Sequence, residues 1–73
     1  MEPVHGSKNI SEVGYDPAER TLYVTFRSGS VYRYHEVPQD VYDKVREATS
    51  VGKYLFQNVS GIYPFSKALQ GGN

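Results

Sequence analysis

The side chains that could catalyse a reaction or hold a metal ion are few and scattered in this sequence. His5 lies near the N-terminus, and His35 is the only other histidine. His35 has no partner at metal-ligand spacing, because a neighbour such as Glu36 points to the opposite face of an extended strand. Cysteine is absent, which excludes a thiolate site, and no serine has a histidine–acid pair expected beside it. We therefore expect no enzyme activity, no catalytic residue, no metal site and no cofactor, and we interpret the chain as an interaction module.

Basic and aromatic side chains offer binding chemistry instead. Arg27, Arg33 and Lys53 could converge, with Lys8 near them. Tyr23 lies across an expected hairpin from Arg33, and a guanidinium beside an aromatic ring suits a base, a phosphate or an acidic peptide. The candidate nucleic-acid-binding residues are thus Arg33, Lys53, Arg27 and Tyr23. The alternative interpretation is a solvated face with scattered charges.

Tyr32 and Tyr34 form a second aromatic pair with two interpretations. They could stack bases, as aromatic side chains do on the sheets of RNA-recognition modules. They could instead pack beneath helices, with their hydroxyls reaching water or a backbone carbonyl. We favour the core role, because the expected strand register gives them Leu22 and Val24 as neighbours.

Apolar residues of the second expected helix suggest a protein contact. Phe56 lies about 100° around the helix from Leu55, so its ring is expected at the surface. Together with Ile62, it is the candidate for contact with a protein partner or with a second copy of the chain. The alternative is that both residues belong to the core of this small domain.

Length and composition restrict the function classes. The chain has 73 residues and equal numbers of basic and acidic side chains, 8 of each, so any nucleic-acid contact must be local. No apolar stretch approaches the roughly 20 residues that span a bilayer, and we expect no secretory signal. We expect a soluble, cytoplasmic protein, a monomer or weak homo-oligomer, whose partner is RNA or a protein. One domain is expected over residues 7–69, with flexible tails at 1–6 and 70–73.

Hydrophobic periodicity defines the elements that must position these residues. Strands are expected near residues 10–15, 21–26 and 31–37, because these segments are rich in β-branched and aromatic residues. Pro38 begins a first helix, and Ser50 is placed to cap a second one that ends near Gly61. The expected fold is α+β: a three-stranded antiparallel β-meander followed by two short helices packed on one face, in the order β-β-β-α-α.

The loop between the second and third expected strands decides which side chains share a face. A two-residue turn would pair Val24 with Arg33, whereas a three-residue loop with Gly29 in the left-handed region pairs Val24 with Tyr32. Only the three-residue loop keeps Arg33 out of the apolar row, and burial of an unpaired charge costs several kcal/mol. We therefore predict the three-residue loop.

Several short motifs resemble those of the KTSC domain. They are Gly14–Pro17, the central tyrosine-x-tyrosine motif Tyr32-Arg33-Tyr34, Ser50–Tyr54 and Tyr63-Pro64-Phe65, and the resemblance covers roughly residues 7–66. That domain is found at the C-terminus of some lysyl-tRNA synthetases and as small stand-alone bacterial and phage proteins.

The resemblance implies a non-catalytic module for which RNA binding has been suggested. It also implies that Lys53 is the basic residue that usually follows a glycine in this family. This chain departs from the pattern of Asn and Arg in the second helix and its exit, where it has Phe56, Ser60 and Ile62. The departure weakens the expectation of RNA binding for this protein.

Overall fold

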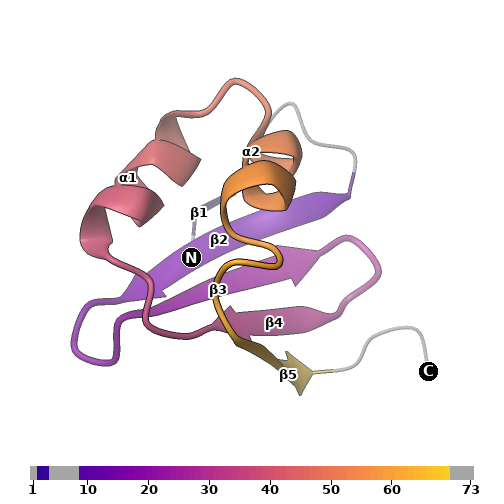
Figure 1. Cartoon of the computed structure of the whole chain (residues 1–73). Coiled ribbons are helices and arrows are strands. Elements are labelled where there is room, and N and C mark those ends of the chain that lie inside the picture. Colours follow the sequence, from indigo (N-terminus) through magenta and orange to yellow (C-terminus); the bar gives the residue numbers. More distant parts are fainter. Residues whose placement is uncertain (1, 4–8, 70–73) are drawn as a thin grey trace.

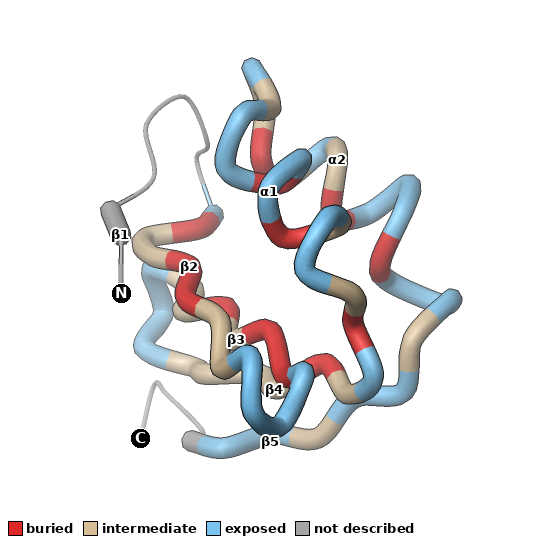
Figure 2. The backbone as a smooth tube through the Cα atoms, turned by 90° about the vertical axis from the view of Figure 1, so that its left-hand side faces the viewer, coloured by how far each residue is buried: buried red, intermediate tan, exposed pale blue. Residues whose placement is uncertain are grey.

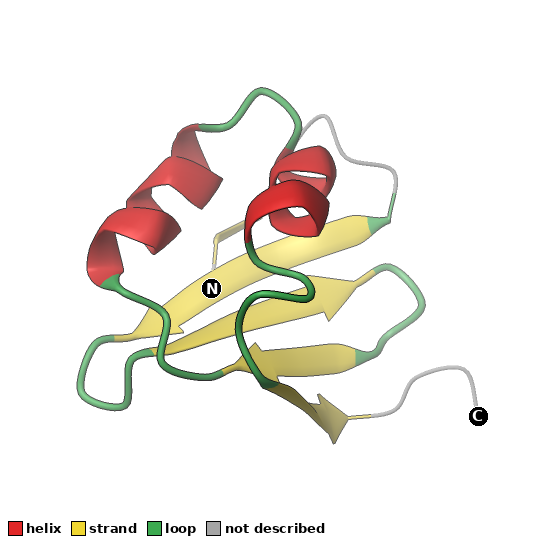
Figure 3. Cartoon of the chain, viewed as in Figure 1, coloured by secondary structure: helices red, strands yellow, loops and turns green. Residues whose placement is uncertain are grey.

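The computed structural model describes residues 2–3 and 9–69 and has an α+β architecture of one sheet and one helical layer (Figures 1 and 3). The strands are β1 (Glu2–Pro3), β2 (Ile10–Asp16), β3 (Thr21–Phe26), β4 (Val31–Tyr34) and β5 (Phe65–Leu69), and the helices are α1 (Gln39–Glu47) and α2 (Val51–Asn58). All neighbouring strands are antiparallel, in the order β1-β2-β3-β4-β5. The expected α+β class, with its central meander followed by two helices, is confirmed.

The sheet has two strands that the sequence analysis did not predict. β1 pairs Glu2 with Val13, and β5 returns after the helices to pair with β4. The other residues of the expected flexible tails, residues 1, 4–6 and 70–73, lie outside the described residues, as do His5 and Lys8. No helix in the part of the chain that the structure describes is long and apolar enough to cross a membrane.

The β3–β4 hairpin has the predicted three-residue loop. The Phe26 amide donates a hydrogen bond of 2.8 Å to the Ser30 carbonyl, and Gly29 has a φ of 99°. This positive φ suits glycine, which has no Cβ to clash with the backbone. As a result Val24 pairs with Tyr32 and Leu22 with Tyr34, and these four side chains share the face of the sheet that packs against the core.

The helices cover the β2–β3 side of one sheet face, whereas β4 and β5 extend beyond them (Figure 1). Buried segments of strands and helices face one another across the interior (Figure 2). The core is apolar, and its buried residues are Ile10, Val13, Leu22, Val24, Tyr34, Val37, Tyr42, Val45, Val51, Leu55 and Val59. Removal of these side chains from water is the main stabilising contribution in a domain without disulfides.

Tyrosine and proline fix the position of α1. Pro38 occupies the N-cap, one position before the helix begins, and Asp40 lies in the first turn, where a negative charge is favourable. Tyr15 of β2 stacks on Tyr42 with 5.1 Å between ring centroids, and its hydroxyl donates to the Val37 carbonyl. Ser50 is the N-cap of α2 as expected, but its side chain makes no capping hydrogen bond.

Candidate functional site

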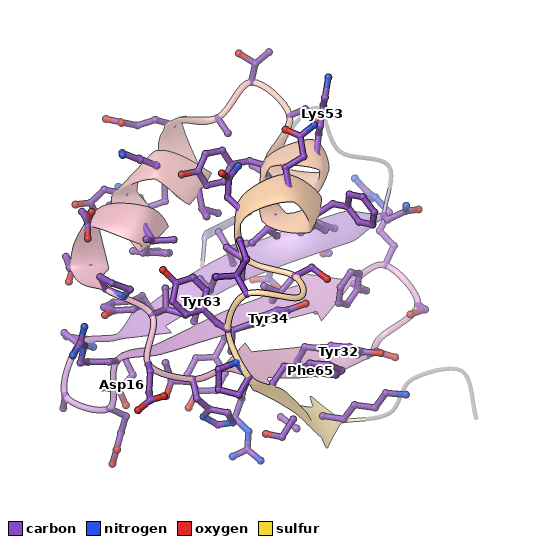
Figure 4. All side chains as sticks on the ribbon, viewed as in Figure 1. Asp16, Tyr32, Tyr34, Lys53, Tyr63 and Phe65 are labelled. Carbon is purple, nitrogen blue, oxygen red and sulfur yellow. The ribbon has the colours of Figure 1, made fainter. Side chains whose placement is uncertain are left out.

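Four aromatic rings lie side by side on the helix-facing side of the sheet, and we call them the aromatic strip: Phe26, Tyr32, Tyr34 and Phe65. Phe26 contacts Tyr32 edge-on with 5.1 Å between centroids. Tyr32 stacks on Phe65 at 5.3 Å with an angle of only 5° between the rings. The ring centroids of Tyr34 and Phe65 are 5.8 Å apart. Figure 4 shows the rings of Tyr32, Tyr34 and Phe65 together. Strand register produces the set, because Tyr34 and Phe65 are direct partners.

The strip runs from the core to the solvent. Tyr34 is 7% exposed and belongs to the core, whereas Phe26 and Tyr32 are half-buried. Phe65 is 55% exposed, even though it contacts two other rings. An exposed aromatic ring that is already held by its neighbours loses little conformational freedom when a ligand stacks on it.

Two cations accompany the strip. The Nζ of Lys67 lies 5.5 Å from the centroid of the Tyr32 ring, within the range of a cation–π interaction. Arg27 follows directly after β3 and lines a groove beside Phe26. Two positively charged side chains therefore adjoin the aromatic strip.

A groove is lined by residues of the aromatic strip and by Ser60 at the exit of α2. Its wider part, about 500 Å³, has Arg27, Ser28 and Ser30 on one side. Its narrower part, about 360 Å³, continues along α2 beside Leu55 and Phe56. The two parts share four lining residues, namely Asn9, Phe26, Tyr34 and Ser60. Within the described ranges, none of the lining residues is acidic, and such a groove suits a ligand that is apolar in part and neutral or anionic.

Tyr34 lines both parts of this groove and carries a hydroxyl with a shifted pKa. Burial raises the pKa of Tyr34 above its ordinary value of 10.0, and the neighbouring Tyr32 raises it further. A side-chain hydrogen bond with Ser60 lowers the pKa and partly offsets these effects. The phenol is therefore neutral at physiological pH, so it can both donate and accept a hydrogen bond.

The structure does not bring the predicted nucleic-acid-binding residues into one patch. Tyr23 and Arg33 are direct partners on the face opposite the helices, and both are half-buried. Arg27 lies at the groove on the helix-facing side. Lys53 is exposed on α2, beside a shallow hollow with Tyr54, and Figure 4 shows it far from Phe65.

Sequence reasoning missed Phe65 and Lys67 because it did not predict β5. The signal was present in part, since Pro64 is typical of the start of an edge strand. Phe65 and Lys67 are two residues apart, the spacing that puts side chains on one face of a strand.

A hydrogen-bonded histidine–serine pair lies on the opposite face of the sheet. His35 Nε2 and Ser66 Oγ are 2.9 Å apart. The histidine beside this serine was not expected, because the pairing depends on β5. Among residues 2–3 and 9–69, no three metal-ligating side chains converge.

The two candidate protein-contact residues are both at the surface. Phe56 is 77% exposed and Ile62 is 61% exposed. Phe56 also lines the narrower part of the groove, so it adjoins the aromatic strip through Phe26 and Tyr34. The interpretation that places them in the core is wrong.

Comparisons with known proteins point to one family. A family model described as the KTSC domain matches residues 6–63. A protein from Tsukamurella paurometabola is 44% identical over 55 residues, which cover 75% of this chain and 81% of that protein. The crystal structure of a KTSC domain protein from Yersinia pestis is similar, with a TM-score of 0.87, 31% identity, and coverage of 93% of this chain and 94% of the other. A lysine–tRNA ligase from Nostoc sp. is 34% identical over 58 residues, covering 80% of this chain but only 10% of the ligase.

Proposed function

The chain belongs to the KTSC domain family, and from this premise we propose that it is a non-catalytic module that binds single-stranded RNA by stacking bases on the aromatic strip. The observation that carries the proposal is the geometry of Phe65. Its ring lies parallel to that of Tyr32 at 5.3 Å and remains 55% exposed. A base can therefore stack on the exposed Phe65 ring, which its neighbour already holds in position.

Stacking supplies affinity with little sequence preference, because every base has a π-face. Substitution of an aromatic residue in such sites costs about 1–3 kcal/mol per base. Two rings, Phe65 and Tyr32, are accessible enough to take part. Tyr34, with its neutral hydroxyl, and Ser60 both line the groove and supply hydrogen-bonding groups for an unpaired base edge.

Electrostatics supports a local rather than a general attraction for RNA. The net charge is zero, but Arg27 and Lys67 lie beside the strip. Two phosphate contacts on a single strand give a slope of about −1.4 in a plot of log K against log salt concentration. We therefore expect weak, salt-sensitive binding.

The names of some relatives support this ligand class. Lysine–tRNA ligases, by name, act on an RNA, and about a tenth of the length of the Nostoc ligase matches this chain. An RNA ligand also agrees with the cytoplasmic location expected from the sequence.

A titration with single-stranded oligonucleotides tests the proposal. Binding of a fluorescein-labelled RNA strand of about eight nucleotides, a length within the range for small binding folds, is measured by anisotropy at low salt. Phe65→Ala should weaken binding about tenfold, because it removes one stacked base contact. Ile62→Ala is the matched control, since it truncates another exposed apolar side chain that lines neither part of the groove. Equal losses for both variants, or no binding by the unsubstituted protein, would refute the proposal.

A second candidate function is contact with a protein partner, and the exposure of Phe56 and Ile62 favours it. Self-association through this surface predicts that the protein is larger than a monomer by light scattering. Phe56→Ser should then leave the fold intact and restore the monomer. A monomeric unsubstituted protein at high concentration contradicts self-association.

A further inference from the structure

We propose a phosphodiester-binding site, made by Arg33, His35 and Ser66, on the sheet face opposite the aromatic strip. It takes a backbone phosphate of the RNA strand whose bases stack on Phe65. This inference rests on the proposed function and adds the path that the RNA strand takes away from the aromatic strip.

The three side chains converge through strand register. Arg33 and Ser66 are direct partners across β4 and β5. His35 Nε2 lies 2.9 Å from Ser66 Oγ, and the His35 amide donates a 2.8 Å hydrogen bond to the Pro64 carbonyl. All three side chains are half-buried, so each is positioned by the sheet and still reaches solvent.

The chemistry of the cluster suits a phosphate. A guanidinium supplies charge and paired donors, and hydroxyl and imidazole groups add hydrogen bonds. The Nε of Arg33 is buried and lacks a hydrogen-bond partner within the described ranges. Because Nε has almost no exposed surface, a phosphate would contact the terminal nitrogens of the guanidinium.

The edge of the sheet connects this cluster to the aromatic strip. Phe65 and Ser66 are neighbours on β5, and successive side chains of a strand point to opposite faces. β5 is the last strand of the described sheet, so its outer edge is open. The hydrogen bond between the His35 amide and the Pro64 carbonyl joins β4 to β5 one residue before Phe65. Since backbone groups along a strand alternate in direction, the N–H and C=O of Phe65 point away from β4, toward that open edge. An RNA strand with a base stacked on Phe65 can thus cross the edge of the sheet and reach Ser66.

The acidic side chains of β2 that lie on this face are one strand removed from β4. Glu12 and Asp16 are on this face but belong to β2, and β3 lies between them and β4. Asp16 also accepts hydrogen bonds from the Ala18 and Glu19 amides in its own turn. The strand partner of Arg33 on β3 is Tyr23, which is not an acidic residue.

The salt dependence of RNA binding tests the site. The labelled RNA strand of about eight nucleotides is titrated over a range of salt concentrations with the full chain and with Arg33→Gln. We expect a loss of about tenfold in affinity at low salt and a slope of log K against log salt that is smaller by about 0.7, the value for one phosphate contact. Lys44→Gln, which makes the same charge change on the exposed face of α1, should leave the slope unchanged.

Two further measurements keep the outcomes separate. Ser66→Ala should also weaken RNA binding. Because it is a smaller change, it still tests the site if Arg33→Gln disturbs the fold. A strand with neutral methylphosphonate linkages should lose its sensitivity to Arg33→Gln. If Phe65→Ala weakens binding but Arg33→Gln and Ser66→Ala behave like Lys44→Gln, the phosphate site is refuted while base stacking stands. If the unsubstituted protein binds no RNA, the proposed function fails, and this inference fails with it.

Discussion

Replacement of Tyr34 by phenylalanine tests the buried end of the aromatic strip. The ring stays in place, so the substitution leaves no cavity and removes only the hydroxyl and its hydrogen bond with Ser60. A neutral hydrogen bond contributes about 0.5–1.5 kcal/mol to the free energy of unfolding. Ser60 is exposed and can bond to water instead, so we expect the lower part of that range, about 0.5–1 kcal/mol. In a domain of this size, the loss lowers Tm by about 2–8 °C.

The pH dependence gives this prediction a second readout. The pKa of Tyr34 is raised in the folded chain, mainly by burial, so the unfolded chain ionises first as the pH rises above 10.0. The stabilising contribution of the neutral phenol is therefore complete below that pH and is lost as the pH approaches the folded pKa. Tyr34→Phe lacks this contribution, so its stability should fall less steeply with alkaline pH than that of the unsubstituted chain.

Urea denaturation, followed by circular dichroism at neutral and alkaline pH, measures both effects. Tyr23→Phe, on the opposite face of the sheet, is the matched control and should retain the steeper alkaline loss. Identical alkaline profiles for Tyr34→Phe and the unsubstituted protein would refute the reasoning, since they would mean that the hydroxyl is not held in a desolvated site.

Two further substitutions test the fold that positions the site. Gly61 has a φ of 81°, and an added Cβ would meet no atom within 4 Å, so Gly61→Ala should cost only the backbone strain of about 1–2 kcal/mol; a neutral effect in urea denaturation would contradict the left-handed conformation. Leu22 is 0% exposed, and Leu22→Ala should lower the free energy of unfolding by about 2–5 kcal/mol. That is a large part of the stability of a small domain, and thermal denaturation that shows less than 1 kcal/mol of loss would contradict the core assignment.

The parts of the fold that were predictable from the sequence depend on local interactions. The hairpin register followed from Gly29, because only one loop length keeps Arg33 away from the apolar row. The start of α1 followed from Pro38, although the proline lies at the N-cap rather than within the helix. These signals act within a few residues of the structure that they determine.

β5 was not predictable in the same way, because its pairing joins distant segments. Tyr34 and Phe65 are partners across two intervening helices, and the segment from Phe65 to Leu69 contains no β-branched residue. The aromatic strip requires this strand, so the candidate site could be predicted only in part. Tyr34 is in the core as expected, whereas Tyr32 is half-buried and lines the groove.

The register of β5 determines which chemistry each face of the sheet presents. Phe65 and Lys67 join the rings on the helix-facing side, while Ser66 joins Arg33 on the other side. A shift of one residue would exchange the two sets, because side chains alternate between faces. The pairing is irregular only beyond Lys67, where Ala68 is an extra residue between the pairs Tyr32–Lys67 and Val31–Leu69. The bulge follows the residues that the proposed RNA contacts require, so it leaves the alternation of Phe65, Ser66 and Lys67 intact. The core position of Tyr34, the direct partner of Phe65, thus links the stability of the domain to both proposed contacts with the RNA strand.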